Sequence, residues 1–559
     1  MHRAIVLTGH TCVGKSRLAL NLRNRQGFLR LKTSEMVAEI AEKRERPSDR
    51  SGLQTLGDEL DAELGDDWVY EATLSKLKDR QASSDIVVDS IRTAKQLEFF
   101  RSSREIEIIH VHLYASREQV LERAKKKHGE NTDYESADII KREGDISSFR
   151  DDADVRINTD FTDAEDTYVR VAARLHVFPP PDRKCVDVLV GGQFGSEGKG
   201  HISAFLAKEY DVLLRVGGPN AGHTVSGQDE IYTYHQLPSG TKDTDAEVLL
   251  GPGMTIHVPT LLKEIEECGI DEKRLFIDPQ AMIISDEDRH AESGLKERVS
   301  STGSGSGSAA ARRILGRGKS DTQLAKDISE LKLFVGCTAP YRGKTLRRLR
   351  RAYRDKKSIL LEGTQGSGLS LYHGEYPYVT SRDTNVAGCL AEAGISPSSL
   401  RKVIMVVRTT PIRVANPLDS EGNEVGTSGT LKHETNFDAV KERSKLTSDL
   451  KELEKTSTTK RDRRVGWFDW EQFHQSCIIN GPTDIALTFA DYINAKNSSA
   501  RRFEQLSQNT IKFVEELERV ANVPVSLISI RFPRTEDERK DLRGIIDRRA
   551  WRSKRHVSK

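Results

Sequence analysis

The chain has 559 residues, of which 36% are hydrophobic and 31% charged, and its 87 basic and 85 acidic side chains leave a net charge of +2. Single cores stop growing beyond roughly 250–300 residues, so at least two domains are expected. The near-neutral balance gives no global field that would predict nucleic-acid binding. The first apolar run is only about five residues long, too short for a signal peptide or a membrane span. The six cysteines show no C-x-x-C spacing, so we expect reduced thiols in a cytoplasmic protein.

The first third of the chain alternates short apolar runs with helical patterns. We expect strands at residues 4–7, 86–89 and 106–113, and helices at about 15–25 and 117–127. This βαβ rhythm predicts an α/β fold with a parallel, doubly wound sheet. Three consecutive prolines at 179–181 then remove backbone donors and favour an extended spacer.

After the prolines the pattern starts again, with a strand expected at 186–190 followed by a second glycine loop and a helix. We therefore divide the chain into a P-loop, parallel-sheet domain over residues 1–177, a Pro-rich linker over 178–184, and a larger mixed α/β domain over 185–559. Within the larger domain, a polar stretch between about 419 and 455 predicts a surface insertion with one amphipathic helix.

The first glycine loop, GHTCVGKS at residues 9–16, satisfies the G-x-x-x-x-G-K-S pattern between an expected strand and an expected helix. Gly9 and Gly14 let backbone N–H groups curl around phosphate oxygens. Lys15 then neutralises phosphate charge and Ser16 ligates Mg²⁺, which predicts an ATP site. Asp89, at the end of a strand, is a candidate carboxylate for the metal or the acceptor, with a plain structural cap as the alternative.

Basic side chains follow this loop and are candidates to neutralise a transferring phosphoryl group, with solvated helix-face residues as the alternative. They are Arg92, Arg117, Arg123 and Lys125–Lys127. The segment resembles small P-loop nucleotide kinases of the nucleoside-monophosphate and dephospho-coenzyme A kinase type. The resemblance rests on the phosphate loop and on the stretches VVDSIR, IIHVHLYASREQVLER and DADVRINTD. It implies a kinase whose acceptor stays open.

The second glycine loop, GGQFGSEGKG at residues 191–200, is spaced differently, yet Gly195, Gly198 and Gly200 still offer flexible backbone amides to a phosphate. Four further motifs follow in order: GGPNAGHT at 217–224, EGTQG at 362–366, HGEYPYVTS at 373–381 and TTKRDRRVGW at 458–467. This ordered set resembles adenylosuccinate synthetase over roughly residues 186–540.

The resemblance implies a carbon–nitrogen ligase of purine nucleotide biosynthesis. Its members phosphorylate the 6-oxygen of IMP with GTP and Mg²⁺, and the amine of L-aspartate then displaces the phosphate. For this chain it implies that Lys199 holds phosphate, that His223 stabilises the transferring γ-phosphoryl group, and that the Gly222 carbonyl helps to bind Mg²⁺. It also implies a homodimer.

The resemblance assigns four side chains to the substrate nucleotide: Asn220, Thr302, Gln365 and Thr380. The nucleotide phosphate of a neighbouring subunit is assigned to Arg312, with Arg313 as the alternative. Arg461 and Arg463, together with Thr459, match the loop that binds aspartate. Paired planar guanidinium groups suit bidentate capture of a dicarboxylate.

The chain departs from the family at Ser196, where the family has an aspartate. That aspartate is the general base for the purine N1 proton and also contacts the metal, and a hydroxyl with no neighbouring base replaces it in neither task. Glu197 is the nearest remaining carboxylate and the alternative base. Serine at this place resembles the phage branch that acts on dGMP in the 2-aminoadenine pathway, because a small neutral group leaves room for a 2-amino group. We expect IMP as substrate, with dGMP as the alternative.

The pocket for the triphosphate base is altered as well. Residues 488–491, TFAD, keep the base-reading Asp491 but lack the family's lysine, and Ser529 is not followed by the usual glycine two residues on. We expect GTP as donor, with ATP or dATP as the alternative. A non-catalytic purine-nucleotide sensor is the competing hypothesis for the whole domain. The arginine pair at Arg461 and Arg463 favours the ligase, since a sensor has no need of an aspartate site.

Overall fold

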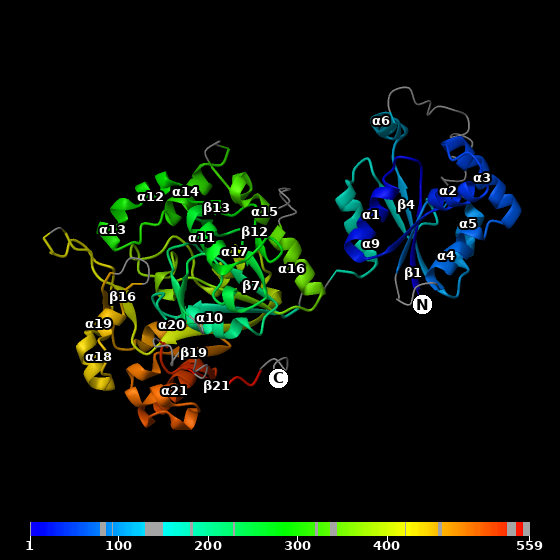
Figure 1. The fold of residues 1–559 in the computed structure, drawn as a ribbon. Coiled ribbons are helices and arrows are strands. Elements are labelled where there is room, and N and C mark those ends of the chain that lie inside the picture. The colour runs from blue at the N-terminus through cyan, green and yellow to red at the C-terminus, as the bar shows by residue number, and fades with distance from the viewer. Residues whose placement is uncertain are drawn as a thin grey trace. The chain divides into compact units, whose positions relative to one another are not determined.

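The structure is a computed structural model that describes residues 2–78, 85–91, 93–128, 149–178, 183–226, 230–318, 322–335, 344–419, 421–456, 461–533 and 544–551. The chain divides into two compact units, Met1–Phe178 and Pro179–Lys559, which are described separately (Figure 1). Within the described residues, we find no helix with the length and apolar character needed to cross a bilayer.

The first unit is built on a five-stranded parallel sheet in the order β2-β3-β1-β4-β5. Its strands are β1 (His2–Thr8), β2 (Leu29–Lys32), β3 (Ile86–Asp89), β4 (Ile106–Tyr114) and β5 (Val155–Asn158). Its helices include α1 (Lys15–Gln26), α2 (Thr33–Lys43), α3 (Arg50–Leu64), α4 (Trp68–Lys78), α5 (Ala94–Arg101), α6 (Arg117–His128) and α9 (Ala164–Arg174).

Two apolar cores, one on each face, hold this sheet between helices (Figure 1). Strand residues alternate between the faces, because successive side chains of a strand point in opposite directions. Ile5 and Leu7 pack with α1 and α9, whereas Ala4 and Val6 pack with α2 to α5. Burial on both faces is typical of parallel sheets, and the predicted α/β class is confirmed for this unit.

The second unit contains a nine-stranded sheet in the order β12-β10-β7-β14-β6-β15-β19-β20-β21. Every neighbouring pair is parallel except the last, β20 with β21. The strands are β6 (Val186–Gly191), β7 (Val212–Arg215), β10 (Glu247–Leu250), β12 (Leu275–Ile277), β14 (Ile359–Glu362), β15 (Leu400–Arg408), β19 (Asp484–Thr488), β20 (Val525–Ser529) and β21 (Ile545–Asp547).

Three smaller sheets lie beside the large one. They pair β8 (His223–Ser226) with β9 (Ile231–Tyr234), β11 (Thr255–Ile256) with β13 (Met282–Ile283), and β18 (Arg463–Gly466) with both β16 (Ile412–Val414) and β17 (Glu434–Thr435). The helices include α10 (Lys199–Ala207), α11 (Val258–Cys268), α12 (Asp286–Ala291), α13 (Ser293–Val299), α14 (Ser306–Leu315), α15 (Lys332–Val335), α16 (Lys344–Arg354), α17 (Val386–Ala393), α18 (Phe437–Ser444), α19 (Leu450–Leu453), α20 (Trp470–Asn480) and α21 (Gln508–Ala521).

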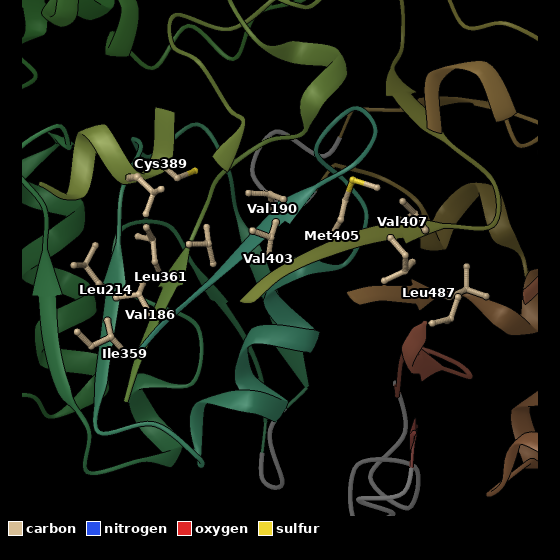
Figure 2. Close-up of a cluster of buried hydrophobic side chains, with 14 of the residues drawn as sticks. Val186, Val190, Leu214, Ile359, Leu361, Cys389, Val403, Met405, Val407 and Leu487 are labelled. Carbon is tan, nitrogen blue, oxygen red and sulfur yellow. The ribbon is translucent and has the colours of Figure 1, made fainter. Parts of the chain in front are cut away.

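The main core of the second unit lies on one face of the large sheet. Figure 2 shows Val186 and Val190 of β6 beside Leu361 of β14 and Val403 and Met405 of β15, and all five are buried. Side chains of α16, α17, α20 and α21 complete this core, and α10 covers the opposite face. The predicted mixed α/β class is therefore confirmed here too.

The segment after β16 differs from the predicted insertion with a single helix. It forms two helices, α18 and α19, because Lys445 adopts a left-handed conformation with φ 63° and Asp449 caps a new helix through the Lys451 and Glu452 amides. Phe437 and Leu450 of these helices are buried in a small core with β16 and β18. The segment is therefore packed against the body of the unit, and it ends at a buried glutamate, Glu454.

Candidate functional site

Residues that the sequence singled out lie at the carboxyl edge of the large sheet. The neighbouring strands β7, β14, β6, β15 and β19 run parallel, and all end at this edge. In open α/β sheets, ligands bind beyond the carboxyl ends of the strands. The topology thus gathers the glycine loop after β6, the EGTQG motif at the end of β14 and the TFAD segment after β19.

Glycines allow the loop between β6 and α10 to approach its neighbours closely. Gly195 and Gly198 have φ of 98° and 82°, which other residues rarely adopt. A Cβ atom on Gly195 would lie 3.0 Å from Gln365 Cα, and one on Gly200 would lie 2.8 Å from His223 Cβ. These predicted nucleotide-binding glycines therefore bring the loop against both Gln365 and His223.

Glu197 and Lys199 form a buried ion pair inside this loop. Lys199 Nζ lies 2.7 Å from Glu197 Oε2 and donates also to the Gly195 carbonyl at 3.2 Å. The other carboxylate oxygen of Glu197 accepts the backbone N–H groups of Gln193 and Gly195, at 2.9 and 2.8 Å. Glu197 thus holds the loop and the lysine in place, and its carboxylate is occupied by these donors.

The predicted phosphoryl-stabilising histidine is also buried and held by a carboxylate. His223 Nδ1 lies 2.5 Å from Glu362 Oε1, and Glu362 further accepts the Ser239 amide and hydroxyl at 2.7 and 2.6 Å. A carboxylate can only accept, so Nδ1 carries the proton. Nε2 of His223 is buried and has no hydrogen-bond partner among the described residues. Gly222, the predicted metal-binding carbonyl, immediately precedes His223 at the start of β8.

Asn220, a predicted substrate residue, contacts the start of α14, whereas Thr380 and Gln365 belong to the HGEYPYVTS and EGTQG motifs. Asn220 Oδ1 accepts the Ser306 hydroxyl at 2.9 Å, and Thr380 donates its amide to Leu369 at 2.8 Å. Gln365 adopts φ 54°, and its buried Oε1 finds no partner in the described part of the chain. Buried polar atoms are normally hydrogen-bonded, so an orphaned amide oxygen beside a phosphate loop is the kind of group that a ligand satisfies.

The loop of Thr302 and the arginines of the predicted aspartate site are brought together. Arg461 donates to the carbonyls of Ser300 and Ser301, at 3.1 and 3.2 Å, directly before Thr302. Arg463 begins β18 and lies 3.4 Å from the Glu454 carboxylate. Burial lowers the pKa of both guanidinium groups. Thr459 lies outside the described residues.

Arg312, the predicted phosphate-binding arginine, lies on α14 and points to a carboxylate of the same unit. Its guanidinium contacts Asp288 at 2.6 and 3.1 Å and the Ile283 carbonyl at 2.9 Å. The alternative, Arg313, donates to the Pro252 carbonyl at 2.9 Å, and burial lowers its pKa. Among the described residues, Arg312 thus forms an ion pair and Arg313 forms none.

Ser196 occupies the loop position where the family has its aspartate. Its backbone carbonyl accepts a hydrogen bond of 3.2 Å from Arg408, a fully buried arginine at the end of β15. Arg408 also pairs with Glu454 at 3.0 Å and stacks over the Phe489 ring, with its guanidinium carbon 4.0 Å from the ring centre. The guanidinium of Arg408 therefore anchors the loop that carries Ser196.

The segment predicted to read the triphosphate base lies beside the same loop. The Thr488 hydroxyl donates to the Glu197 carbonyl at 2.7 Å, which joins the end of β19 to the phosphate loop. Asp491 follows in a short 3-10 helix, and its amide donates to Ile530 at 3.1 Å, next to Ser529 at the end of β20. Asp491 and Ser529 are thus adjacent and both buried.

The phosphate loop of the first unit uses the conformational freedom of its two glycines. Gly9 and Gly14 have φ of 126° and 99°, and a Cβ on Gly9 would lie 1.9 Å from the Leu113 carbonyl oxygen. Lys15 Nζ donates to the Gly9 and His10 carbonyls at 2.5 and 2.6 Å. Burial lowers the pKa of Lys15 to about 8, opposed by the nearby charge of Asp89.

The side chains around this loop are held by the sheet and the helices. Ser16 is exposed in the first turn of α1. Asp89 is buried and pairs with Arg30 at 2.7 Å. Arg123 is engaged by Thr159, at 2.9 Å to its hydroxyl and 2.6 Å to its carbonyl, and Arg92 lies outside the described residues.

Several residues of the second site were not predicted from the sequence. The roles of Glu362, which orients His223, and of Arg408 and Glu454, which hold the Ser196 loop, depend on contacts between distant segments. Ser381 has a buried hydroxyl with no partner among the described residues, beside Gly307 at the start of α14. Its place directly after Thr380 in HGEYPYVTS was the one available signal.

Comparisons with known proteins agree with this geometry. The family model described as adenylosuccinate synthetase matches residues 188–330 and 312–498, and a model described as AAA domain matches residues 5–142. The adenylosuccinate synthetase of Thermococcus onnurineus is 35% identical over 377 residues, which cover 65% of this chain and 98% of the relative. That of Methanocaldococcus jannaschii is 36% identical over 355 residues, 61% of this chain and 93% of the relative.

Two solved structures are similar to the same part of the chain. The adenylosuccinate synthetase of Plasmodium falciparum, described as fully ligated, has a TM-score of 0.53 and 25% identity, and the match covers 66% of this chain and all of that one. The succinoaminodeoxyadenylate synthetase of cyanophage S-2L is bound to dGMP and to dATP as an energy donor. It has a TM-score of 0.50 and 28% identity, and the match covers 65% of this chain and 99% of that one.

A parallel sheet with a glycine phosphate loop, a buried histidine and paired arginines at its carboxyl edge defines a nucleotide-dependent ligase of the adenylosuccinate synthetase type. The chain belongs to the adenylosuccinate synthetase family through its second unit, which confirms the predicted resemblance. Its first unit adds a P-loop nucleotide-binding domain.

Proposed function

We propose that the second unit joins L-aspartate to a 6-oxopurine nucleoside monophosphate at the expense of a nucleoside triphosphate. The observation that carries the proposal is the pair of buried atoms at one edge of the sheet, His223 Nε2 and Gln365 Oε1, neither of which has a hydrogen-bond partner among the described residues. They flank a phosphate loop whose lysine is buried, and Arg461 lies at the Thr302 loop nearby. Membership of the family supports the same reaction.

The proposed chemistry has two steps. The purine N1 proton leaves to water as the 6-oxygen attacks the γ-phosphorus of the triphosphate, the bond to the nucleoside diphosphate breaks, and a 6-phosphoryl purine forms. The aspartate amine then bonds to C6 and loses a proton, while the C6–O bond breaks and inorganic phosphate leaves. The charge of Lys199 and the loop amides other than those of Gln193 and Gly195 stabilise phosphate charge, and His223 Nε2 faces the group in transfer. Arg461 and Arg463 bind the two carboxylates of aspartate.

For the purine, we propose a 2-amino-6-oxopurine nucleotide such as dGMP in place of the IMP that we expected. Loss of the family's aspartate removes the base for the N1 proton of either nucleotide, and the carboxylate of Glu197, the alternative base, is engaged by Lys199 and two loop amides. We assign Glu197 the role of holding the loop. A small, neutral Ser196 leaves room for a 2-amino group and accepts a hydrogen bond from it. The cyanophage synthetase supports this substrate.

IMP is the second candidate. It is supported by the curated relatives, which are adenylosuccinate synthetases at 33–36% identity. For the donor we propose GTP, because Asp491 keeps the carboxylate that reads a guanine base. ATP or dATP is the alternative, supported by the missing lysine and by the dATP donor of the cyanophage protein.

The chain's own donors fit a magnesium ion that arrives with the triphosphate. Among the described residues there is no cluster of three or more His, Cys, Asp or Glu side chains that could hold a metal. Mg²⁺ typically keeps few protein ligands and takes the rest from phosphates and water. In the second unit the Gly222 carbonyl would hold it, and in the first unit the exposed Ser16 hydroxyl. The ion would neutralise charge on the phosphate oxygens.

For the first unit we propose an ATP-dependent nucleotide kinase. The phosphate loop of Gly9 and Gly14, with Lys15 against its carbonyls, supports binding of the triphosphate. Asp89 lies at the end of the adjacent strand β3, in register with Leu7 of β1, and its charge acts on Lys15. The acceptor stays open.

One experiment tests the proposal for the second unit. Purified protein is incubated with L-aspartate and each of IMP, GMP and dGMP against each of GTP, ATP and dATP, and the products are identified by mass spectrometry. A succinylated purine nucleotide with stoichiometric release of phosphate is expected, with dGMP as the best acceptor. Product from IMP alone would select the second candidate. Bound nucleotide without any product in all nine mixtures would instead support the sensor.

A further inference from the structure

Glu454 is a buried carboxylate to which the proposed reaction assigns no task. It directly follows α19, is 4% exposed, and lies seven residues before Arg461 in the chain. Three side chains donate to it: Arg408 at 3.0 and 3.3 Å, Tyr492 at 2.6 Å and Arg463 at 3.4 Å. Its surroundings therefore combine two cations with one anion.

Arg408 extends this cluster to the phosphate loop. The same terminal nitrogen that contacts Glu454 donates to the Ser196 carbonyl at 3.2 Å. A continuous path of three contacts thus runs from Ser196 through Arg408 and Glu454 to Arg463. The first of these residues lies in the loop proposed to meet the purine, and the last in the strand proposed to bind aspartate.

The path is rigid and poorly hydrated. Arg408 is 1% exposed, its guanidinium is stacked over the Phe489 ring, and its backbone exchanges two hydrogen bonds of 3.0 Å with Gln193. Charged hydrogen bonds in such surroundings are stronger than in water, and a displacement at one end is not relaxed by solvent. Movement of the Ser196 carbonyl therefore changes the position of Glu454, and with it that of Arg463.

We propose that Glu454 is a positioning residue that couples the purine site to the aspartate site, through Arg408 on one side and Arg463 on the other. The inference rests on the proposed function only for the names of the two ligands. Purine nucleotide binding at the Ser196 loop sets the orientation of Arg463, so that each ligand tightens the binding of the other. Such coupling is reciprocal by thermodynamic necessity.

The test measures coupling rather than affinity, because removal of a charge changes the attraction of any anion. The dissociation constant of dGMP, and in parallel of IMP, is measured by calorimetry without triphosphate, in the presence and absence of saturating L-aspartate. In wild-type protein we expect the dissociation constant of the nucleotide without aspartate to exceed that with aspartate by about tenfold or more. This ratio lies within the usual range of coupling energies. In Glu454→Gln, which keeps the shape, the ratio should fall below about twofold, whichever way the separate affinities move.

The chain offers a matched control. Glu434 pairs with Arg464, the next residue of β18, but it is 43% exposed and contacts neither Arg408 nor the phosphate loop in the described structure. Glu434→Gln should keep the wild-type ratio. A merely structural role of Glu454 would weaken both ligands and leave the ratio unchanged.

A second variant serves if Glu454→Gln fails to fold, as judged by circular dichroism. Arg408→Lys preserves the buried charge but loses the fork that reaches Ser196 and Glu454 together, so it should also reduce the ratio. Full coupling in either folded variant, or no coupling in the wild type, overturns the inference. The measurement needs binding and no turnover. Coupled binding without product would therefore contradict the proposed reaction but support the inference.

Discussion

His223 Nδ1 lies 2.5 Å from Glu362 Oε1, and this contact decides which ring nitrogen faces the proposed γ-phosphoryl group. Burial, together with the charge of Arg215, lowers the pKa of His223 to about 4. Burial opposes ionisation of Glu362, but the contacts with His223 and Arg215 bring its pKa to about 2. At pH 7 a neutral imidazole therefore donates Nδ1–H to an ionised carboxylate. Nε2 receives a proton only when negative phosphate charge arrives.

The first prediction concerns this histidine. His223→Ala should lower turnover by about 10²–10³, the usual loss when one donor to a transition state is removed. Glu362→Gln should also lower turnover, because an amide no longer fixes the tautomer of the ring. Phosphate release under saturating substrates is the measurement. His290, exposed on α12, supplies the control, and His290→Ala should behave as wild type. Equal turnover in the two alanine variants would contradict the assignment.

Local patterns were sufficient to predict the two phosphate loops, the strands that precede them and the α/β class, because these features follow from neighbouring residues. Contacts across the chain were not predictable in this way. Arg408 is 212 positions from Ser196 and Glu362 is 139 from His223, so no spacing rule connects them. The role of Glu197 stays a prediction. Its position suggested a base, and the contacts of its carboxylate with two loop amides and Lys199 were not predictable from the sequence.

The second prediction is that the two units fold separately. Each has its own buried core, so residues 1–178 and 183–559 should each be soluble and show a cooperative thermal transition. The first fragment should bind ATP with Mg²⁺ in calorimetry, and Lys15→Ala should weaken this binding. Aggregation of both fragments would argue against the boundary at the prolines.

The third prediction is a pH dependence of ATP binding to the first unit. Lys15 has a lowered pKa of about 8 in the ligand-free loop, and phosphate charge raises it on binding. Below pH 8 the amine is charged in both states, so the affinity contributed by this group is constant. Above pH 8 the free protein must first take up a proton, and the dissociation constant should rise about tenfold per pH unit.

Lys15→Arg provides the control for this pH dependence, because a guanidinium stays charged throughout the range. Calorimetry on residues 1–178 between pH 7 and 9.5 is the measurement. A flat profile in the wild type, or the same slope in Lys15→Arg, would assign the pH dependence to another group.

The fourth prediction concerns Ser196, where the chain and its family differ. Ser196→Asp restores a carboxylate that can act as a base on IMP, and it places a larger, charged group where a 2-amino group would lie. The ratio of kcat/KM for IMP over that for dGMP should therefore rise, and each tenfold change corresponds to about 1.4 kcal/mol of transition-state stabilisation. Steady-state kinetics of both nucleotides in wild type and variant give the ratio. Ser398, exposed before the start of β15 and so at the opposite edge of the sheet, offers a control for the substitution itself, and Ser398→Asp should leave the ratio unchanged. The opposite outcome is a wild-type enzyme that prefers IMP and a folded Glu197→Gln variant that no longer turns IMP over. It would return Glu197 to the role of base and reject dGMP as the substrate.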